Sequence, residues 1–239
     1  MSKTEKSLDG YIKFCAIHKP DVAPAHPMLA ELDALRTTLF DSGWLGQSPE
    51  GIGFGNISLR ANYLQQGVNK DQAQPNAFII TATGTGGARK LGPDGYCLVC
   101  DFDLSANSVK SRGPLKPSSE SMSHGAIYRA APSVMCIAHL HSLELYNCLL
   151  AAGAPSTPIE AAFGTPHLAM ALENLVAKSP LAKSPMEVTI IMKGHVPGII
   201  FYAPSLQALQ ACFNFLQNLA ARQDLMPSQT VPGQTHNLP

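Results

Sequence analysis

The sequence predicts a single three-layer α/β domain. Segments in which apolar residues recur at helical spacing alternate with short, strand-like apolar runs along most of the 239 residues. The chain carries no internal repeat and no long linker, and several strand-like runs lie close enough to form antiparallel hairpins. We place the domain at residues 28–222, between an N-terminal arm at 1–27 and a flexible, polar C-terminal tail at 223–239.

The N-terminal half begins without a regular pattern. Residues 1–27 are polar and then rich in proline, and we expect this arm to be loosely held. From Met28 the leucines recur at helical spacing and Gly43 ends the run, which predicts a helix. The polar stretch 105–117 carries no predicted element. Strands are expected at 55–60, 78–83 and 96–102.

The C-terminal half alternates between helices and strands. A helix is expected to begin at Ser118 or Ser119 and to end near Ala131, because Pro132 follows. The apolar run 134–138 then predicts a strand. Further helices are expected at 143–152, 166–178 and 205–222, and further strands at 188–193 and 198–202.

The composition favours a small-molecule site over a nucleic-acid or membrane surface. The chain is 45% hydrophobic and only 14% charged, against roughly 25% charged residues in typical soluble proteins. Its 17 basic and 17 acidic residues cancel, so no net field attracts nucleic acid or an anionic membrane. Any recognition of a phosphate group would then depend on local geometry.

The predicted location is the cytoplasm. The longest apolar runs are far shorter than the roughly 20 residues that cross a bilayer, and the first residues lack the apolar core of a signal peptide. Most of the six cysteines lie in apolar runs, as free thiols do in a reducing compartment. Cys97 and Cys100 have the spacing of a zinc or redox pair, but the sequence holds no second pair and strand residues three apart face opposite sides.

Three histidines give the strongest indication of chemistry. His139 and His141 end the apolar run 134–138, and side chains two apart on a strand point to the same face. His195 follows another apolar run, beside Gly194. Two ligands on one strand and a third from a second element form the usual plan of a three-histidine metal site with an open position for substrate. An isolated His-x-His pair is more often a core or surface feature, so the neighbouring motifs decide.

Three further segments could bind an anionic ligand. In 53–58, glycines let the backbone approach a ligand, and the Asn56 amide can donate to an oxyanion. In 81–87, backbone N–H groups and hydroxyls can form an anion-binding nest, although such a segment is more often a simple turn. Ser118 and Ser119 combine hydroxyls with the free N–H groups of a helix start.

Glu120 and His124 follow on the same helix, four residues apart and on one face. Glu120 could act as an acid and base, or it could only place a favourable charge near the helix dipole. His124 could support the site, but we expect a hydrogen-bonded structural role.

The order of these motifs resembles the class II aldolase/adducin family, whose enzyme members include fuculose-phosphate aldolase and ribulose-phosphate 4-epimerase. The resemblance covers roughly residues 28–222. It is carried by Gly55-Asn-Ile-Ser58, Ile80-Thr-Ala-Thr-Gly84, Pro117-Ser-Ser-Glu120 with His124 and Tyr128, Ala138-His-Leu-His141, Phe163-Gly-Thr165 and Gly194-His195.

This resemblance implies a three-layer α/β/α fold with a mostly antiparallel central sheet, and a homotetramer. It also implies a divalent metal bound by His139, His141 and His195, usually Zn2+, with Mn2+, Fe2+ and Co2+ as alternatives. Glu120 would be the acid and base beside the metal. The other matching residues would hold a substrate phosphate, and they are Asn56, Thr83, Gly84, Ser118 and Ser119.

The expected function is that of a metal-dependent aldolase, which cleaves or forms a C–C bond in a small, phosphorylated hydroxy-carbonyl substrate. The metal would stabilise an enediolate, while Glu120 moves the proton between hydroxyl and carbon. The alternatives are a sugar-phosphate epimerase or dehydratase using the same site, and a non-catalytic, adducin-like assembly protein. The chain departs from the family enzymes in its short stretch between His141 and Phe163, and in a tail without tyrosine.

Overall fold

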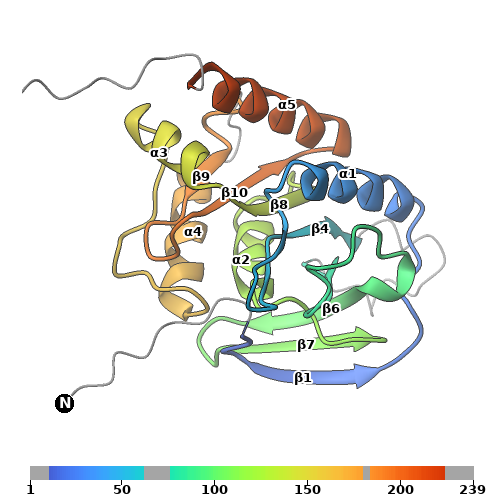
Figure 1. Ribbon diagram of the computed structural model, residues 1–239. Helices are drawn as coiled ribbons and strands as arrows, with labels where there is room; N and C mark the ends of the chain where they lie inside the picture. Colours follow the sequence, from blue (N-terminus) through green and yellow to red (C-terminus); the bar gives the residue numbers. More distant parts are fainter. Residues whose placement is uncertain (1–10, 62–75, 180–183, 224–239) are drawn as a thin grey trace, which may run out of the picture.

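The computed structural model describes residues 11–61, 76–179 and 184–223, and it shows one large sheet between two layers of helices (Figure 1). In these residues the sheet has eight strands in the order β1-β7-β6-β5-β4-β8-β10-β9, and a separate hairpin pairs β2 with β3. The strands are β1 (Cys15–Pro20), β2 (Gly46–Gln47), β3 (Gly53–Phe54), β4 (Asn56–Arg60), β5 (Phe78–Thr81), β6 (Tyr96–Asp103), β7 (Ser108–Gly113), β8 (Cys136–His141), β9 (Thr189–Ile191) and β10 (Gly198–Ala203).

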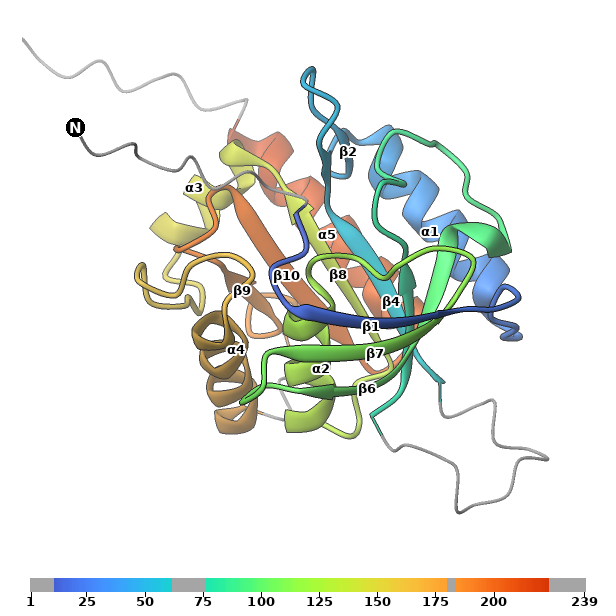
Figure 2. The same cartoon turned by 90° about the horizontal axis from the view of Figure 1, so that it is seen from below.

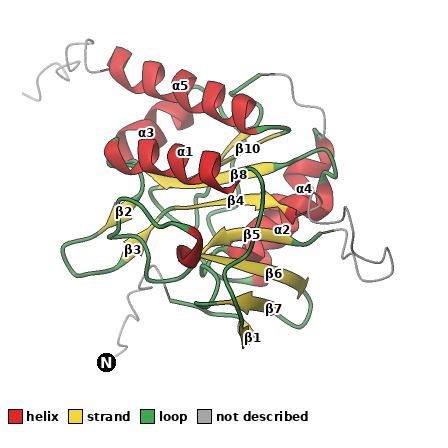
Figure 3. Ribbon diagram, turned by 90° about the vertical axis from the view of Figure 1, so that its right-hand side faces the viewer, coloured by secondary structure: helices red, strands yellow, loops and turns green. Residues whose placement is uncertain are grey.

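The neighbouring strands of the large sheet run antiparallel, except that β1 runs parallel to β7. The three-layer fold with a mostly antiparallel sheet is therefore confirmed. Figure 3 shows α1, α3 and α5 on one side of the sheet and α2 and α4 on the other. The helices are α1 (Leu29–Asp41), α2 (Ser121–Ala130), α3 (Leu143–Ala151), α4 (Pro166–Lys178) and α5 (Leu206–Gln223).

Each face of the sheet buries its own apolar core. The first core joins α1, α3 and α5 to the sheet through residues such as Leu32, Leu149 and Phe213. The second core joins α2 and α4 to the opposite face through residues such as Ile127 and Leu172. Because strand side chains alternate between faces, β8 can supply Ala138 and Leu140 to the first core and Ile137 to the second.

Local capping sets where two of the helices begin. The Ser142 hydroxyl accepts a hydrogen bond from the Leu145 amide at the start of α3, directly after the two histidines of β8. The Thr165 hydroxyl accepts from the Leu168 amide at the start of α4, where Pro166 occupies the first turn.

Two strands of the large sheet were not predicted, and neither was the β2–β3 hairpin. The arm expected to be loosely held includes β1, whose residues pair with β7 over six positions at the edge of the sheet. The polar stretch 105–117 includes β7, in which only alternate residues such as Val109 and Ser111 are buried. No residue of β1 is buried and only alternate residues of β7 are, so the side chains of both strands give little apolar signal.

The six cysteines are free thiols, as predicted. Burial raises the pKa of the Cys97 thiol to about 12 and also raises that of Cys100, so both stay protonated near neutral pH.

Within the described residues, the structure contains no helix that is long and apolar enough to cross a membrane. Of the tail predicted at 223–239, Gln223 ends α5 and residues 224–239 lie outside the described residues.

Candidate metal centre and adjoining cavity

The three predicted histidines converge on one point. His139 and His141 leave the same face at the end of β8, and His195 lies in the connection between β9 and β10. Antiparallel pairing of β10 with β8 brings that connection to the end of β8, with Gly198 opposite His141. The Nε2 atoms of the three rings lie 3.1, 3.2 and 3.2 Å apart.

The surroundings hold these imidazoles neutral. Burial lowers the pKa of His139 to about 4, and it also lowers the pKa values of His141 and His195, with a further decrease from the neighbouring rings. His139 Nδ1 lies 3.0 Å from the Ile199 carbonyl oxygen. Because a carbonyl can only accept, Nδ1 carries the hydrogen and Nε2 keeps its lone pair for a ligand.

The donor set fits a divalent cation. In a neutral imidazole, each ring nitrogen either donates or accepts a hydrogen bond. Three Nε2 atoms that face one another therefore cannot all be paired by hydrogen bonds among themselves. Zinc–nitrogen bonds of about 2.0–2.1 Å in tetrahedral geometry place ligand nitrogens about 3.3 Å apart, close to the observed separations. Imidazole ligands also suit iron, nickel and copper, so the donor atoms do not identify the ion.

Aromatic rings stack on two of the three histidines. The Phe54 ring stacks on His141 with centroids 5.5 Å apart, and the Phe163 ring stacks on His195 at 4.6 Å. Phe163 belongs to a predicted motif, but its contact with His195 could not be read from the sequence because 32 positions separate the two residues. These contacts restrict the orientation of the rings and keep water from their outer faces.

Glu120 lies beside the histidines, as the predicted role requires. It is the N-cap residue of α2, it is 2% exposed, and its Oε1 lies 3.7 Å from His195 Nε2. Since the histidines are neutral without a metal, this contact is an approach between a carboxylate and an imidazole rather than an ion pair.

A cavity of about 330 Å³ opens next to Glu120 and His139. All five residues that were predicted to hold a substrate phosphate line this cavity, and the structure therefore brings them together. They are Asn56, Thr83, Gly84, Ser118 and Ser119. Asn56 pairs with His139 across β4 and β8, and its Oδ1 is buried without a hydrogen-bond partner among the described residues. A buried amide oxygen in this position is suited to a ligand hydroxyl.

Backbone pairing assembles the hydroxyl-rich side of the cavity. The Thr83 amide donates to the Lys116 carbonyl at 2.9 Å, and the Ser118 amide donates to the Thr81 carbonyl at 3.2 Å. These bonds place Thr83 and Gly84 beside Ser118 and Ser119, and we call these four residues the hydroxyl cradle. Gly84 has φ +76°, a conformation that favours glycine.

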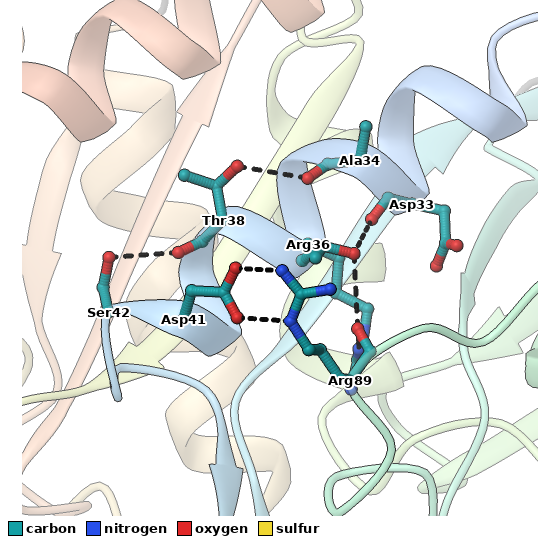
Figure 4. A network of polar contacts seen from close by, with 8 residues as sticks. Asp33, Ala34, Arg36, Thr38, Asp41, Ser42 and Arg89 are labelled. Atoms are coloured by element: carbon teal, nitrogen blue, oxygen red, sulfur yellow. Dashed lines mark hydrogen bonds and ion pairs between the residues drawn. The ribbon is translucent and has the colours of Figure 1, made fainter.

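The residues after the cradle pack against α1 and the β2–β3 hairpin. A Cβ on Gly86 would clash with Gly46 and Gly53, which accounts for the glycine at this position. Arg89 forms a bidentate pair with Asp41 at 2.6 and 2.7 Å, as Figure 4 shows. Arg89 therefore binds a protein carboxylate on the surface and not a ligand in the cavity.

His124 has the hydrogen-bonded role that was expected. Its Nδ1 lies 2.7 Å from the Ser58 hydroxyl oxygen, which also lies 2.8 Å from the Tyr128 hydroxyl. Burial lowers the pKa of His124 well below its usual value, so this ring is neutral. The side chains of Ser58, His124 and Tyr128 therefore form a buried, hydrogen-bonded group between β4 and α2.

Comparison with known proteins agrees with this arrangement. Residues 41–223 match the Class II Aldolase and Adducin N-terminal domain. A 109-residue stretch is 35% identical to methylthioribulose-1-phosphate dehydratase from Leptospira interrogans, and it covers 46% of this chain. That stretch spans only 38% of the length of the relative.

Solved structures share the fold at low sequence identity. The YgbL protein from Klebsiella pneumoniae is 19% identical with a TM-score of 0.55, covering 85% of this chain and 91% of that one. L-fuculose-1-phosphate aldolase from Thermus thermophilus is 17% identical with a TM-score of 0.53, covering 82% and 90%. A sugar-phosphate aldolase from Thermotoga maritima is 16% identical with a TM-score of 0.54, covering 86% and 98%.

The match over residues 41–223 includes α2, β8, the three histidines and the hydroxyl cradle. The resemblance first indicated by scattered motifs therefore extends over most of the folded domain. This chain belongs to the class II aldolase and adducin N-terminal domain family.

Proposed function

We propose that this protein is a metal-dependent aldolase that cleaves or forms a C–C bond in a small, phosphorylated hydroxy-carbonyl substrate. One observation carries the proposal: the buried Glu120 carboxylate lies 3.7 Å from the histidine cluster and lines the same cavity as the hydroxyl cradle. The acid–base group, the anion cradle and His139 of the histidine cluster line one cavity, and these are the parts that such a reaction needs.

His139, His141 and His195 would hold the cation, and Zn2+ is our first choice, with Mn2+, Fe2+ and Co2+ as alternatives. When bound, the cation supplies Lewis-acid stabilisation of negative charge on a substrate oxygen. The hydroxyl cradle would bind the phosphate through the side chains of Thr83, Ser118 and Ser119 and the exposed backbone of Gly84.

Glu120 would move the proton. In the cleavage direction, the substrate hydroxyl loses its proton to the Glu120 carboxylate, and the C–C bond breaks to give an aldehyde. The electron pair of that bond stays on the other fragment, which is the phosphorylated hydroxyketone. Glu120 then returns the proton to the carbon that carries the pair, so one carboxylate serves both halves of the step.

A dehydratase on the same site is the second candidate. It is favoured by the 35% identity to methylthioribulose-1-phosphate dehydratase over 109 residues. Both reactions begin at a hydroxyl and a carbonyl near the cation, but a dehydratase releases water and leaves the carbon chain intact. The product therefore separates the two candidates.

The test is a screen of purified, metal-loaded protein against phosphorylated ketoses, with products followed by mass spectrometry. An aldolase yields two carbonyl fragments, whereas a dehydratase yields one product that is lighter by one water. A protein that binds no metal in any preparation and turns over no compound would point to an adducin-like assembly role. Native mass spectrometry of the same sample tests the homotetramer that we propose on family resemblance.

A further inference from the structure

One residue on the wall of the cavity comes from outside the region that matches the family. Tyr11 lines the cavity together with Glu120 and His139, yet the family match begins at residue 41. The Tyr11 side chain is 63% exposed. The other tyrosines in the described part of the chain are buried, and they are Tyr96, Tyr128, Tyr146 and Tyr202.

The segment that carries Tyr11 contacts a residue that packs against the histidine cluster. Lys13 Nζ donates a hydrogen bond to the Phe163 carbonyl at 3.1 Å and lies 4.8 Å from the centroid of the Phe163 ring. That ring stacks on His195. Phe163 therefore links Lys13, near the start of the described residues, to His195.

Further contacts hold residues 11–14, which we call the N-terminal segment, from Lys13 onward. Asn107 Nδ2 donates to the Lys13 carbonyl at 3.2 Å, and the Cys15 amide donates to the Asn107 carbonyl at 2.8 Å. The Phe14 side chain is buried in the core beneath the sheet. Figure 2 shows this part of the chain passing in front of β8 and β10 before it turns into β1.

Tyr11 is therefore an aromatic side chain held at a cavity mouth by its neighbours in sequence, with most of its own surface uncovered. An exposed tyrosine without attachments would lose conformational entropy on binding a ligand, which offsets the contact. Here much of the backbone ordering has already taken place on folding. A ligand that covers the ring would gain apolar contact, and the phenol can donate one hydrogen bond.

We infer that Tyr11 is a substrate-contacting residue that determines specificity, an assignment that rests on the proposed function. The ring covers the part of a phosphorylated hydroxyketone that extends between the histidine cluster and the hydroxyl cradle. The phenol donates to an oxygen of that part. Tyr11 thus adds to a cavity whose other lining residues all lie in the part of the chain that matches the family.

Binding to metal-loaded protein tests this inference with two probes, measured by isothermal titration calorimetry. Dihydroxyacetone phosphate can reach both the histidine cluster and the cradle, whereas inorganic phosphate occupies only the cradle. Tyr11→Phe should weaken binding of dihydroxyacetone phosphate by about three- to tenfold, the usual effect of one hydrogen bond. Tyr11→Ala should weaken it further. Neither variant should change the metal content or the binding of inorganic phosphate.

A matched control removes a hydroxyl elsewhere. Tyr202→Phe alters a buried tyrosine of β10 that does not line the cavity, and it should bind both probes as the wild type does. A second readout is chemical: nitration of Tyr11 by tetranitromethane, located by peptide mass spectrometry, should be slowed by dihydroxyacetone phosphate more than by inorganic phosphate.

The outcomes separate this inference from the proposed function. If wild-type protein binds dihydroxyacetone phosphate, but both Tyr11 variants bind it equally well and nitration is not slowed, Tyr11 is not a substrate contact and the proposed function stands. If the metal-loaded wild type binds neither this probe nor any phosphorylated ketose of the screen, both proposals are wrong. Weakened binding of inorganic phosphate in the Tyr11 variants would show a distorted cradle and would also overturn the inference.

Discussion

The α-carbon of Gly198 lies against the ring of His139, so closely that a Cβ at position 198 would come within 3.0 Å of His139 Cε1. The same Cβ would lie 2.7 Å from His195 Cδ2. Gly198 is the first residue of β10 and pairs with His141 across the sheet. Two of the three candidate ligands therefore occupy space that is available only because this residue lacks a side chain.

We expect Gly198→Ala to reduce the metal content substantially. The added methyl group must push the rings of His139 and His195 apart from their present positions, since it would also meet the His195 carbonyl oxygen and has little room to move away. Metal per chain, measured by inductively coupled plasma mass spectrometry, checks this. Gly43→Ala is the control, because φ +72° makes it a strained substitution with nothing within 4 Å of the new Cβ. It should lower stability and leave the metal content unchanged.

Removing a ligand and removing the acid–base group should have different effects. His139→Ala should abolish tight metal binding, because two histidines then remain. Glu120→Gln should keep the metal and lower turnover by at least about 100-fold, the range usual for a general acid and base. Metal analysis and steady-state kinetics on the substrate found in the screen check both variants. Undiminished turnover in Glu120→Gln would remove Glu120 from the reaction.

Periodicity predicted most of the fold because most elements bury one face. The α1, α4 and α5 helices and the β4, β5 and β6 strands all appear close to their expected positions. The β1 and β7 strands do not follow this rule, since β1 forms the edge of the sheet, β7 lies next to it, and both leave alternate or more residues unburied. Their pairing depends on contacts distant in sequence, which local patterns do not record.

The site was predictable to the extent that it rests on local geometry. Two-residue spacing on a strand predicted that His139 and His141 would share a face, and their convergence with His195 is observed. The family resemblance connected these residues with Glu120 and the hydroxyl cradle. The attachment of Tyr11 through Lys13 and Phe163 was not predictable, because it joins an irregular segment to a loop 150 positions away.

The metal-free protein should become less stable as the pH falls from about 6.5 to 4. In the unfolded chain, His139 takes up a proton near pH 6.5, whereas burial in the folded chain keeps it neutral down to about pH 4. The unfolded state then binds more protons over this range, so the free energy of unfolding decreases as the pH falls. For His139 alone the loss is roughly 3 kcal/mol, and burial shifts His141 and His195 in the same direction.

Urea denaturation of chelator-treated protein at pH 7.5, 5.5 and 4.5 measures this loss. His139→Asn is the comparison, because its amide can still donate a hydrogen bond but does not titrate. The pH dependence of its unfolding free energy should be shallower than that of the wild type. Equal slopes for the two proteins would mean that His139 is not neutral in the folded, metal-free state.

Arg36 should matter far more for stability than its neighbour Arg89. The Arg36 guanidinium is 1% exposed and donates to the carbonyls of Thr85 and Arg89 at 3.1 and 3.0 Å. Arg36→Met keeps most of the side-chain volume but leaves these carbonyls without the donor, at a cost of about 2 kcal/mol or more in the free energy of unfolding. Because the affected segment continues from the hydroxyl cradle, binding of inorganic phosphate should also weaken.

Arg89→Ala provides the matched comparison on the same segment. Its pair with Asp41 is bidentate, but both side chains are about half exposed, at 55% and 47%. Exposed pairs of this kind contribute less than about 1 kcal/mol, so this variant should unfold in urea almost as the wild type does and should bind phosphate normally. The contrast follows from burial: water can replace the carboxylate of Asp41 at the surface, but it cannot reach Arg36 to replace its two carbonyl partners. If both variants lost the same stability, the exposed pair rather than the buried guanidinium would hold the segment against α1.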